Sequence, residues 1–373
     1  MIRKLKGTNF KIRVAEPNIT EEDAKAVYQA VKENCLSGSG PYNKKFEYEF
    51  SKYLGIENAV TVNSGTAALH LSLEALGIKN GDEVITTPFT FAATSNVIVV
   101  QNAKPVFVDI ESETFNMDPS KIEKSITSKT KAIMPIHYAG QSCEMDEINE
   151  IAQKHNLHVI EDAAHAAGST YKRKKIGSHS IAVCFSFHPV KNLAMPTGGL
   201  ISINHKNHQK FKKLLSARRW CGITDRKETD YDVKELGWNY YMNEFSAVIG
   251  LTQLKKLDKL NNIRKNIAKF YDKQINVEHK IPFDKRCSYH LYWICVKNRN
   301  KFRKELNNRG IETGTHYKPI HEMSFYKMAA RNKIADKILN TEIAGKEIVT
   351  IPIHPNLTKS QLDYIVKSVN KFA

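Results

Sequence analysis

The chain has 373 residues, of which 41% are hydrophobic and 25% charged, as is ordinary for a soluble globular protein of two or three domains. No segment approaches the roughly 18 uncharged apolar residues that a membrane span needs, and no apolar stretch follows the charged N-terminus as in a secretory signal. We therefore expect a cytoplasmic protein. The six cysteines are scattered, without a C-x-x-C pair, so neither a metal site nor a disulfide framework is indicated.

The net charge is +17, from 56 basic and 39 acidic residues. Such a field can attract anions, for example nucleotides, sugar phosphates or nucleic acid. It can equally reflect a lysine-rich proteome that places Lys and Asn on solvent-facing helices. The lysines are spread widely and form no stripe with interleaved aromatic residues, so nucleic-acid binding receives only weak support.

Short apolar runs alternate with helical patterns over the first 200 residues. Thr20, with Asp23 three residues later, is typical of the capped start of a helix over 20–33. We expect strands at 59–62, 83–87, 105–109, 132–136, 158–161, 181–185 and 199–203, with helices at 66–76, 91–100 and 145–155. This alternation predicts an α/β fold: a mostly parallel sheet with helices on both faces, in which ligands bind beyond the carboxyl ends of the strands.

After about residue 245 the pattern changes. The sequence predicts a long helix over 245–271, a strand over 289–296, and helices over 301–309 and 359–372. We therefore predict a large α/β domain over residues 1–245 and a smaller α+β domain over residues 246–373.

Two predicted strand-to-helix turns offer groups that could hold a phosphorylated aromatic ring. At the first, backbone N–H groups and the hydroxyls of Ser64 and Thr66 suit a phosphate, although they are also typical of an ordinary helix cap. At the second, Phe89 or Phe91 could stack on a flat ring, although either aromatic could equally pack in the core.

An acid and a lysine follow two further strands. Asp162 could face a pyridinium nitrogen or could simply cap a helix. Lys191 lies among the apolar residues Pro189, Val190 and Leu193. Apolar surroundings disfavour the charged form of a lysine, so its amine would be a usable nucleophile. The alternative is that Lys191 is only a surface charge, as most lysines are. Such a lysine and such an acid are the minimum equipment of an enzyme that uses pyridoxal phosphate (PLP).

Together these segments resemble the DegT/DnrJ/EryC1/StrS family of sugar aminotransferases over nearly the whole chain. The motifs that carry the resemblance lie at 64–69, 137–141, 161–165, 185–192, 198–199, 238–244, 316–321 and 351–355. Each motif is weak alone, whereas their order and spacing make the set specific. The resemblance implies a fold-type-I PLP aminotransferase, with a mostly parallel sheet in a large domain and a smaller α+β C-terminal domain.

The resemblance also implies roles for single residues. Lys191 would carry the cofactor as a Schiff base and move the proton, while Asp162 would face the pyridinium nitrogen. His165 would lie near the phenolate oxygen, although a core histidine is also possible there, and Phe91 would cover the ring. The phosphate would be held by Ser64, Gly65, Thr66 and Ser186, together with Asn239 from a neighbouring subunit, which implies a homodimer.

Further matches concern the substrate. His316, Tyr317 and His321 match a segment near the sugar. Thr197 stands where the family commonly has an acid, a departure that bears on the shape or polarity beside the lysine. The family's dehydratase branch replaces the lysine with histidine, so the presence of Lys191 disfavours that branch.

The function implied is transfer of an amino group from an amino acid, with L-glutamate expected, to a keto-sugar attached to a nucleoside diphosphate. Segment 137–140 resembles the branch that aminates C4 more than the branch that aminates C3. The product would be an amino sugar for a surface glycan, a glycoprotein or a secondary metabolite. Other readings stay open: a C3 keto-sugar, a keto-inositol or another cyclic ketone as acceptor, a PLP-bound regulatory protein without turnover, or a nucleic-acid-binding protein.

Overall fold

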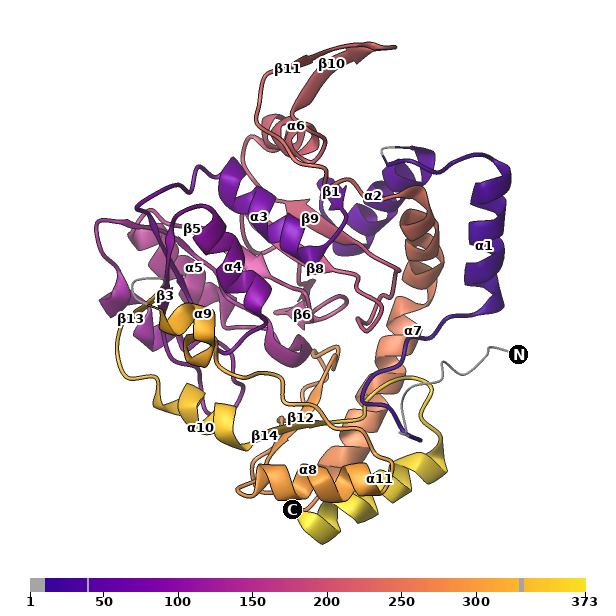
Figure 1. Ribbon diagram of the computed structural model, residues 1–373, viewed down its shortest axis with the longest axis vertical. Coiled ribbons are helices and arrows are strands. Elements are labelled where there is room, and N and C mark those ends of the chain that lie inside the picture. Colours follow the sequence, from indigo (N-terminus) through magenta and orange to yellow (C-terminus); the bar gives the residue numbers. More distant parts are fainter. Residues whose placement is uncertain (1–10, 39, 329–331) are drawn as a thin grey trace.

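The computed structural model describes residues 11–38, 40–328 and 332–373, and an eight-stranded sheet lies at its centre (Figure 1). Across the sheet the strands are β1 (Asn58–Val62), β9 (Gly199–Ile203), β8 (Ala182–Ser186), β5 (His158–Asp162), β4 (Thr130–Ile133), β2 (Glu83–Thr86), β3 (Lys104–Phe107) and β13 (Lys333–Ile334). Only β9 runs antiparallel to its neighbours, β1 and β8. The prediction of a mostly parallel sheet is confirmed.

Helices cover both faces of this sheet, because its strands are apolar on both sides. One face packs against α2 (Pro41–Leu54), α5 (Met145–Lys154) and α7 (Glu244–Gln274), and the other against α3 (Gly65–Ala75), α4 (Ala92–Val100) and α6 (His208–Arg218). On β8, Val183 and Phe185 enter the first core, while Ala182 and Cys184 enter the second. The side chains alternate between the faces, as a strand of period two requires.

The same alternation separates two neighbouring acids at the end of β5. Val159 lies in the core beneath α5, so Glu161, two residues on, projects to that face, and Asp162 projects to the face of α3 and α4. Glu161 is fully buried and accepts a hydrogen bond from His137 Nε2 at 2.7 Å, while His137 Nδ1 accepts from the backbone N–H of Cys143. Glu161 is thus paired with a histidine within the core, whereas Asp162 faces the cavity at the carboxyl ends of the strands.

Helix α7 extends from α1 (Glu21–Lys32) and α2 toward the C-terminal strands (Figure 1). It packs against β12 (Tyr292–Cys295), α8 (Arg299–Asn308), β14 (Ile348–Ile351) and α11 (Lys359–Phe372), whereas β13 joins the edge of the central sheet. The remaining elements are β6 (Thr170–Tyr171), β7 (Lys174–Lys175), β10 (Ile223–Lys227), β11 (Asp230–Val233), α9 (Ser324–Lys327) and α10 (Leu339–Glu347). The boundary that we predict near residue 245 falls at the start of α7, and the division into two domains stays a prediction. No helix in the described ranges is long and apolar enough to cross a membrane.

The expected elements agree with the structure to within a few residues. The structure also contains elements that the sequence analysis did not predict. Thr20 and Asp23 form the predicted capping box at the start of α1. The strand expected at 132–136 is shorter at its C-terminal end, since β4 ends at Ile133 and Pro135 has no N–H to donate to a neighbouring strand. The sequence did not predict helices α2, α6, α9 and α10, the short strands β6, β7 and β13, strand β14, or the hairpin of β10 and β11.

Glu161→Leu should lower the free energy of unfolding by about 3 kcal/mol, because it leaves the Nε2–H of His137 buried without an acceptor. Glu161→Gln should lose much less, since its amide oxygen can still accept that hydrogen bond. Urea unfolding followed by circular dichroism measures both variants. Equal losses in the two variants would contradict the importance of this pair.

Candidate active site

A cavity of about 320 Å³ lies at the carboxyl ends of the central strands. Every predicted site residue except Asn239 and His321 lines it: Ser64, Gly65 and Thr66 at the start of α3, Phe91 before α4, Asp162 and His165 after β5, Ser186 and Lys191 after β8, and His316 and Tyr317 from the C-terminal part of the chain. The topology therefore brings together residues that are up to about 250 positions apart in the sequence, as expected for this edge of a parallel sheet.

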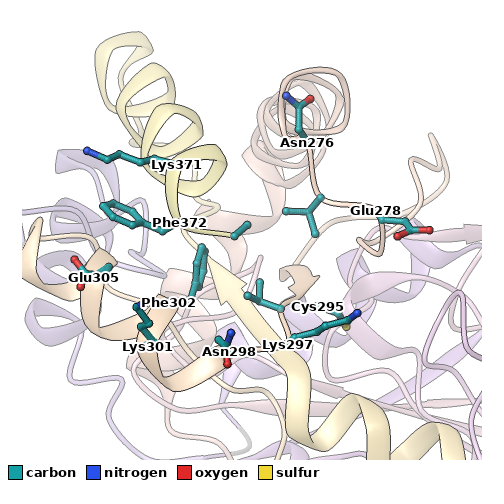
Figure 2. Close-up of a pocket in the computed structure, with 13 residues that line it drawn as sticks. Asn276, Glu278, Cys295, Lys297, Asn298, Lys301, Phe302, Glu305, Lys371 and Phe372 are labelled. Atoms are coloured by element: carbon teal, nitrogen blue, oxygen red, sulfur yellow. The ribbon is translucent and has the colours of Figure 1, made fainter.

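A second hollow, of about 460 Å³, lies between the end of β12, α8 and α11 (Figure 2). Cys295, Phe302 and Phe372 contribute to its lining, as do lysines and glutamates of opposite charge. None of the predicted site residues lines it. The first cavity is therefore the candidate active site, even though it is the smaller of the two.

Lys191 lies in the candidate site with its amine close to a histidine. Its Nζ is 3.4 Å from Nε2 of His290, a buried residue that sequence analysis did not single out. Burial lowers the pKa of Lys191 to about 8, and the nearby carboxylate of Asp162 partly opposes this shift. The uncharged amine, which can act as a nucleophile or a base, is therefore far more abundant near neutral pH than in an exposed lysine.

Asp162 is buried and held by two hydrogen bonds. The Thr94 hydroxyl donates to its Oδ2 at 2.8 Å, and the backbone N–H of Ala164 donates to its Oδ1 at 3.1 Å. Since the proton of Thr94 goes to Asp162, the hydroxyl of Thr90, 2.9 Å away, donates to Thr94 in turn. Burial raises the pKa of Asp162, while the bond from Thr94, the bond from Ala164 and the charge of Lys191 all work against that rise.

His165 packs in the cavity wall beside Tyr317. Its Nε2 is 3.1 Å from the Tyr317 hydroxyl, and the two rings stack at an interplanar angle of 20°. Burial lowers the pKa of His165 far below its ordinary value, so the ring is neutral. Its Nδ1 is buried and has no hydrogen-bond partner within the described residues, so a polar group of the site stands available to a ligand.

The turn from β1 into α3 forms a tight backbone pocket. A Cβ atom on Gly65 would lie 2.8 Å from the Cβ of Ser186, and one on Gly199 would lie 2.4 Å from the carbonyl of Ser64, so both positions require glycine. Ser64 Oγ accepts from the N–H of Ala67 at 3.1 Å and is thus a helix cap, one of the two roles that its sequence allowed. Thr197 donates its hydroxyl proton to the carbonyl of Asn63, which ties the start of β9 to the same turn.

Of three further predicted site residues, one lies at the mouth of the cavity and two lie outside it. Phe91 is 61% exposed, and its ring centroid is 6.1 Å from that of Tyr317. Asn239 is exposed and lies outside the cavity, with its backbone carbonyl 3.3 Å from Nδ2 of Asn63. His321 is half-buried in the short turn Ile320–Glu322 and does not line the cavity.

Sequence reasoning missed His290 and Thr94. Thr94 lies in a segment whose sequence signal comes from its aromatic residues. A histidine within the otherwise apolar run 289–296 is a weak signal, because a buried polar side chain needs a partner in the fold. That partner is nearly 100 residues away in the sequence.

Comparison with known proteins identifies the family. The sequence model of the DegT/DnrJ/EryC1/StrS aminotransferase family matches residues 17–370. The chain belongs to this family. Members are PLP-dependent, and the chain is accordingly an aminotransferase with the fold-type-I architecture.

Relatives and solved structures match over almost their whole length. The chain is 37% identical to UDP-4-amino-4,6-dideoxy-N-acetyl-beta-L-altrosamine transaminase of Campylobacter jejuni, covering 95% of each chain. It is 35% identical to GDP-perosamine synthase of Escherichia coli, covering 97% of this chain and 98% of that protein. The PLP form of the putative sugar aminotransferase Spr1654 of Streptococcus pneumoniae superposes with a TM-score of 0.91 at 30% identity, covering 96% and 97% of the two chains.

Thr94→Val removes a hydrogen bond that lowers the pKa of Asp162, so this pKa should rise further. The carboxylate is then lost at a higher pH as the solution is acidified, and the acidic limb of the activity profile should move to higher pH. The dissociation constant for PLP should increase about tenfold, the effect of one hydrogen bond to a charged group. Thr94→Ser keeps the hydroxyl and should behave as the wild type; a Val variant with an unchanged profile would contradict this role.

Proposed function

We propose that the protein binds PLP through Lys191 and transfers the amino group of L-glutamate to C4 of a nucleotide-linked keto-sugar. The observation that carries the proposal is the placement of a largely buried lysine with a lowered pKa in the same cavity as a buried acid. The lysine can bond to the aldehyde of the cofactor, and the acid can pair with its ring nitrogen.

The residues of the cavity fit this cofactor. The tight turn at Gly65, where a side chain would collide with Ser186, leaves room for a phosphate beside the N-terminus of α3. The unpartnered Nδ1 of His165 is a buried polar group that a ligand atom can satisfy. Phe91 is exposed at the mouth of the cavity, where its ring can stack on a planar ligand.

PLP supplies an electron sink for the carbon that loses its proton. The protein would supply the base, since the amine of Lys191 can take a proton at Nζ and return it. The carboxylate of Asp162, oriented by Thr94, would keep a positive charge on the ring nitrogen. Tyr317 and His165 would shield one wall of the cavity from water and fix a hydrogen bond there.

The acceptor is inferred from the relatives and from the charge of the chain. Two of the relatives are named for reactions of UDP- and GDP-linked sugars, and one of these names places an amino group at position 4. The net charge of +17 would attract a nucleoside diphosphate. We therefore keep C4 of a nucleotide-linked keto-sugar as the site of amination and place the enzyme in the cytoplasm, where such substrates are made.

We also propose a homodimer in which Asn239 serves the neighbouring active site. Asn239 is exposed at the edge of its own phosphate turn, next to Asn63. Just before it in the sequence, the hairpin of β10 and β11 extends from the body of the molecule (Figure 1). Tyr231, Val233 and Leu236 are exposed on or beside this hairpin, and apolar side chains in such positions are typical of a subunit contact.

The first test is the visible spectrum with PLP. The wild type should become yellow at a rate that falls as the pH drops below about 8, because the protonated amine of Lys191 cannot attack the aldehyde, and it should lose that band when L-glutamate is added. Lys191→Ala should abolish turnover, while Lys259→Ala, which removes an exposed lysine of α7, should leave it unchanged. A Lys191→Ala variant that transaminates at the normal rate would sink the proposal.

Product analysis tests the acceptor. Incubation with L-glutamate and a UDP- or GDP-linked 4-keto-sugar should yield 2-oxoglutarate and a sugar whose new amine is located at C4 by NMR. An amine found at C3 would end the preference for C4 while leaving the cofactor and the donor in place. Absence of any reaction with keto-sugars, together with turnover of another cyclic ketone, would replace the acceptor class.

A further inference from the structure

His290 is the closest polar neighbour of the reactive amine, although the proposed function assigns it no role. Its Nε2 lies 3.4 Å from Nζ of Lys191, and the side chain is only 4% exposed. Its ring centroid is 4.4 Å from that of His165, so it packs directly behind a residue that lines the cavity. Its Nδ1 is buried and, in the described part of the chain, has no hydrogen-bond partner.

The backbone around His290 is fixed to the segment that carries the lysine. Asn192, the residue after Lys191, donates its side-chain amide to the carbonyl of Ser288 at 2.8 Å. The N–H of His290 donates to the carbonyl of Ala139 at 2.9 Å. The imidazole and the amine are thus held at a constant separation by contacts on both segments.

The imidazole is neutral and remains so. Burial lowers the pKa of His290 far below its ordinary value, and the positive charges of Lys191 and the buried Arg264 add to this effect. Arg264 itself donates to the carbonyls of Tyr289 and Ile353. A neutral ring next to an amine that gains and loses a proton can accept a hydrogen bond from it in both states, provided that the ring proton is on Nδ1.

We propose that His290 is a positioning residue for Lys191, whose Nε2 accepts a hydrogen bond from the free amine and stabilises the amine after it has taken a proton. The inference rests on the proposed function, in which Lys191 is the proton carrier. The remaining titratable groups around the amine are Asp162, His165, His188, His316 and Tyr317. His165, His188 and His316 all have lowered pKa values and Tyr317 a raised one, so Asp162 is the only one of these five that opposes the effect of burial on Lys191.

The direct test reads the amine without any cofactor. Cofactor-free protein is labelled with trace acetic anhydride between about pH 6 and pH 10, and the peptide that carries Lys191 is quantified by mass spectrometry. The wild type should show a midpoint near the value of about 8 set by burial. His290→Phe should move the midpoint to lower pH by about one unit, because the charged amine loses its acceptor. His290→Gln, which retains an acceptor, should stay close to the wild type.

A control variant separates this role from a general loss of packing. His354 is also a buried histidine near Arg264, but the amine of Lys191 lies within hydrogen-bonding distance of His290 and not of His354, so His354→Gln should leave the midpoint of Lys191 unchanged. A purely structural role for His290 would lower the melting temperature without moving the midpoint. An unmoved or raised midpoint in His290→Phe, or equal shifts in the Phe and Gln variants, would overturn the proposal.

Single-turnover kinetics with glutamate supply the second readout. In His290→Phe the rate should fall about tenfold with little change in KM, and the isotope effect with α-deuterated glutamate should increase because proton transfer is slowed. An increase in KM that exceeds the decrease in rate would contradict the positioning role. If Lys191 of the wild type titrates as expected but never reacts with PLP, the proposed function is refuted. The role of His290 in setting the titration of Lys191 would still hold in that case.

Discussion

The partial burial of Lys191 is the constraint on which the rest of the site depends. An exposed lysine would be charged at neutral pH and would carry out neither nucleophilic attack nor proton abstraction. Here burial brings its pKa to about 8, with Asp162 close enough to moderate the shift. The neutral histidines around the cavity accommodate this amine without adding a permanent charge, since burial keeps His165 and His290 uncharged as well.

The sheet makes this burial possible by separating the acids of β5. Glu161 and Asp162 are adjacent in the sequence, yet the pleat sends them to opposite faces. Glu161 accepts a hydrogen bond from His137 within the core, whereas Asp162 reaches the cavity and is held there by Thr94 from α4. If both acids pointed into the cavity, their repulsion would raise the pKa of one of them and favour its uncharged form.

Elements with local signals were predicted well, and elements supported by distant residues were missed. The capped helices α1 and α11 carry their start signals within four residues of the first turn. Helix α2 has Pro41 at its first position as its only local start signal and no capping side chain nearby, because its first turn is capped by a distant carboxylate: Glu244 accepts from the N–H of Tyr42 at 2.7 Å. The helix therefore depends on a tertiary contact that no local pattern reveals.

The sequence by itself determined which residues follow which strands, and with that it placed the Ser64 turn, the acid Asp162 and Lys191 at one edge of the sheet, whereas their order along that edge came from the strand order β1, β9, β8, β5. Parallel strands place such residues together regardless of the loops between them, so the strand pattern alone assigns Ser64, Asp162 and Lys191 to one site. Only the tertiary structure decided that His290 meets Lys191, that Thr94 holds Asp162 and that Asn239 turns away from its own cavity. These outcomes depend on side-chain contacts between elements far apart in the chain, and nothing in the local sequence encodes their partners.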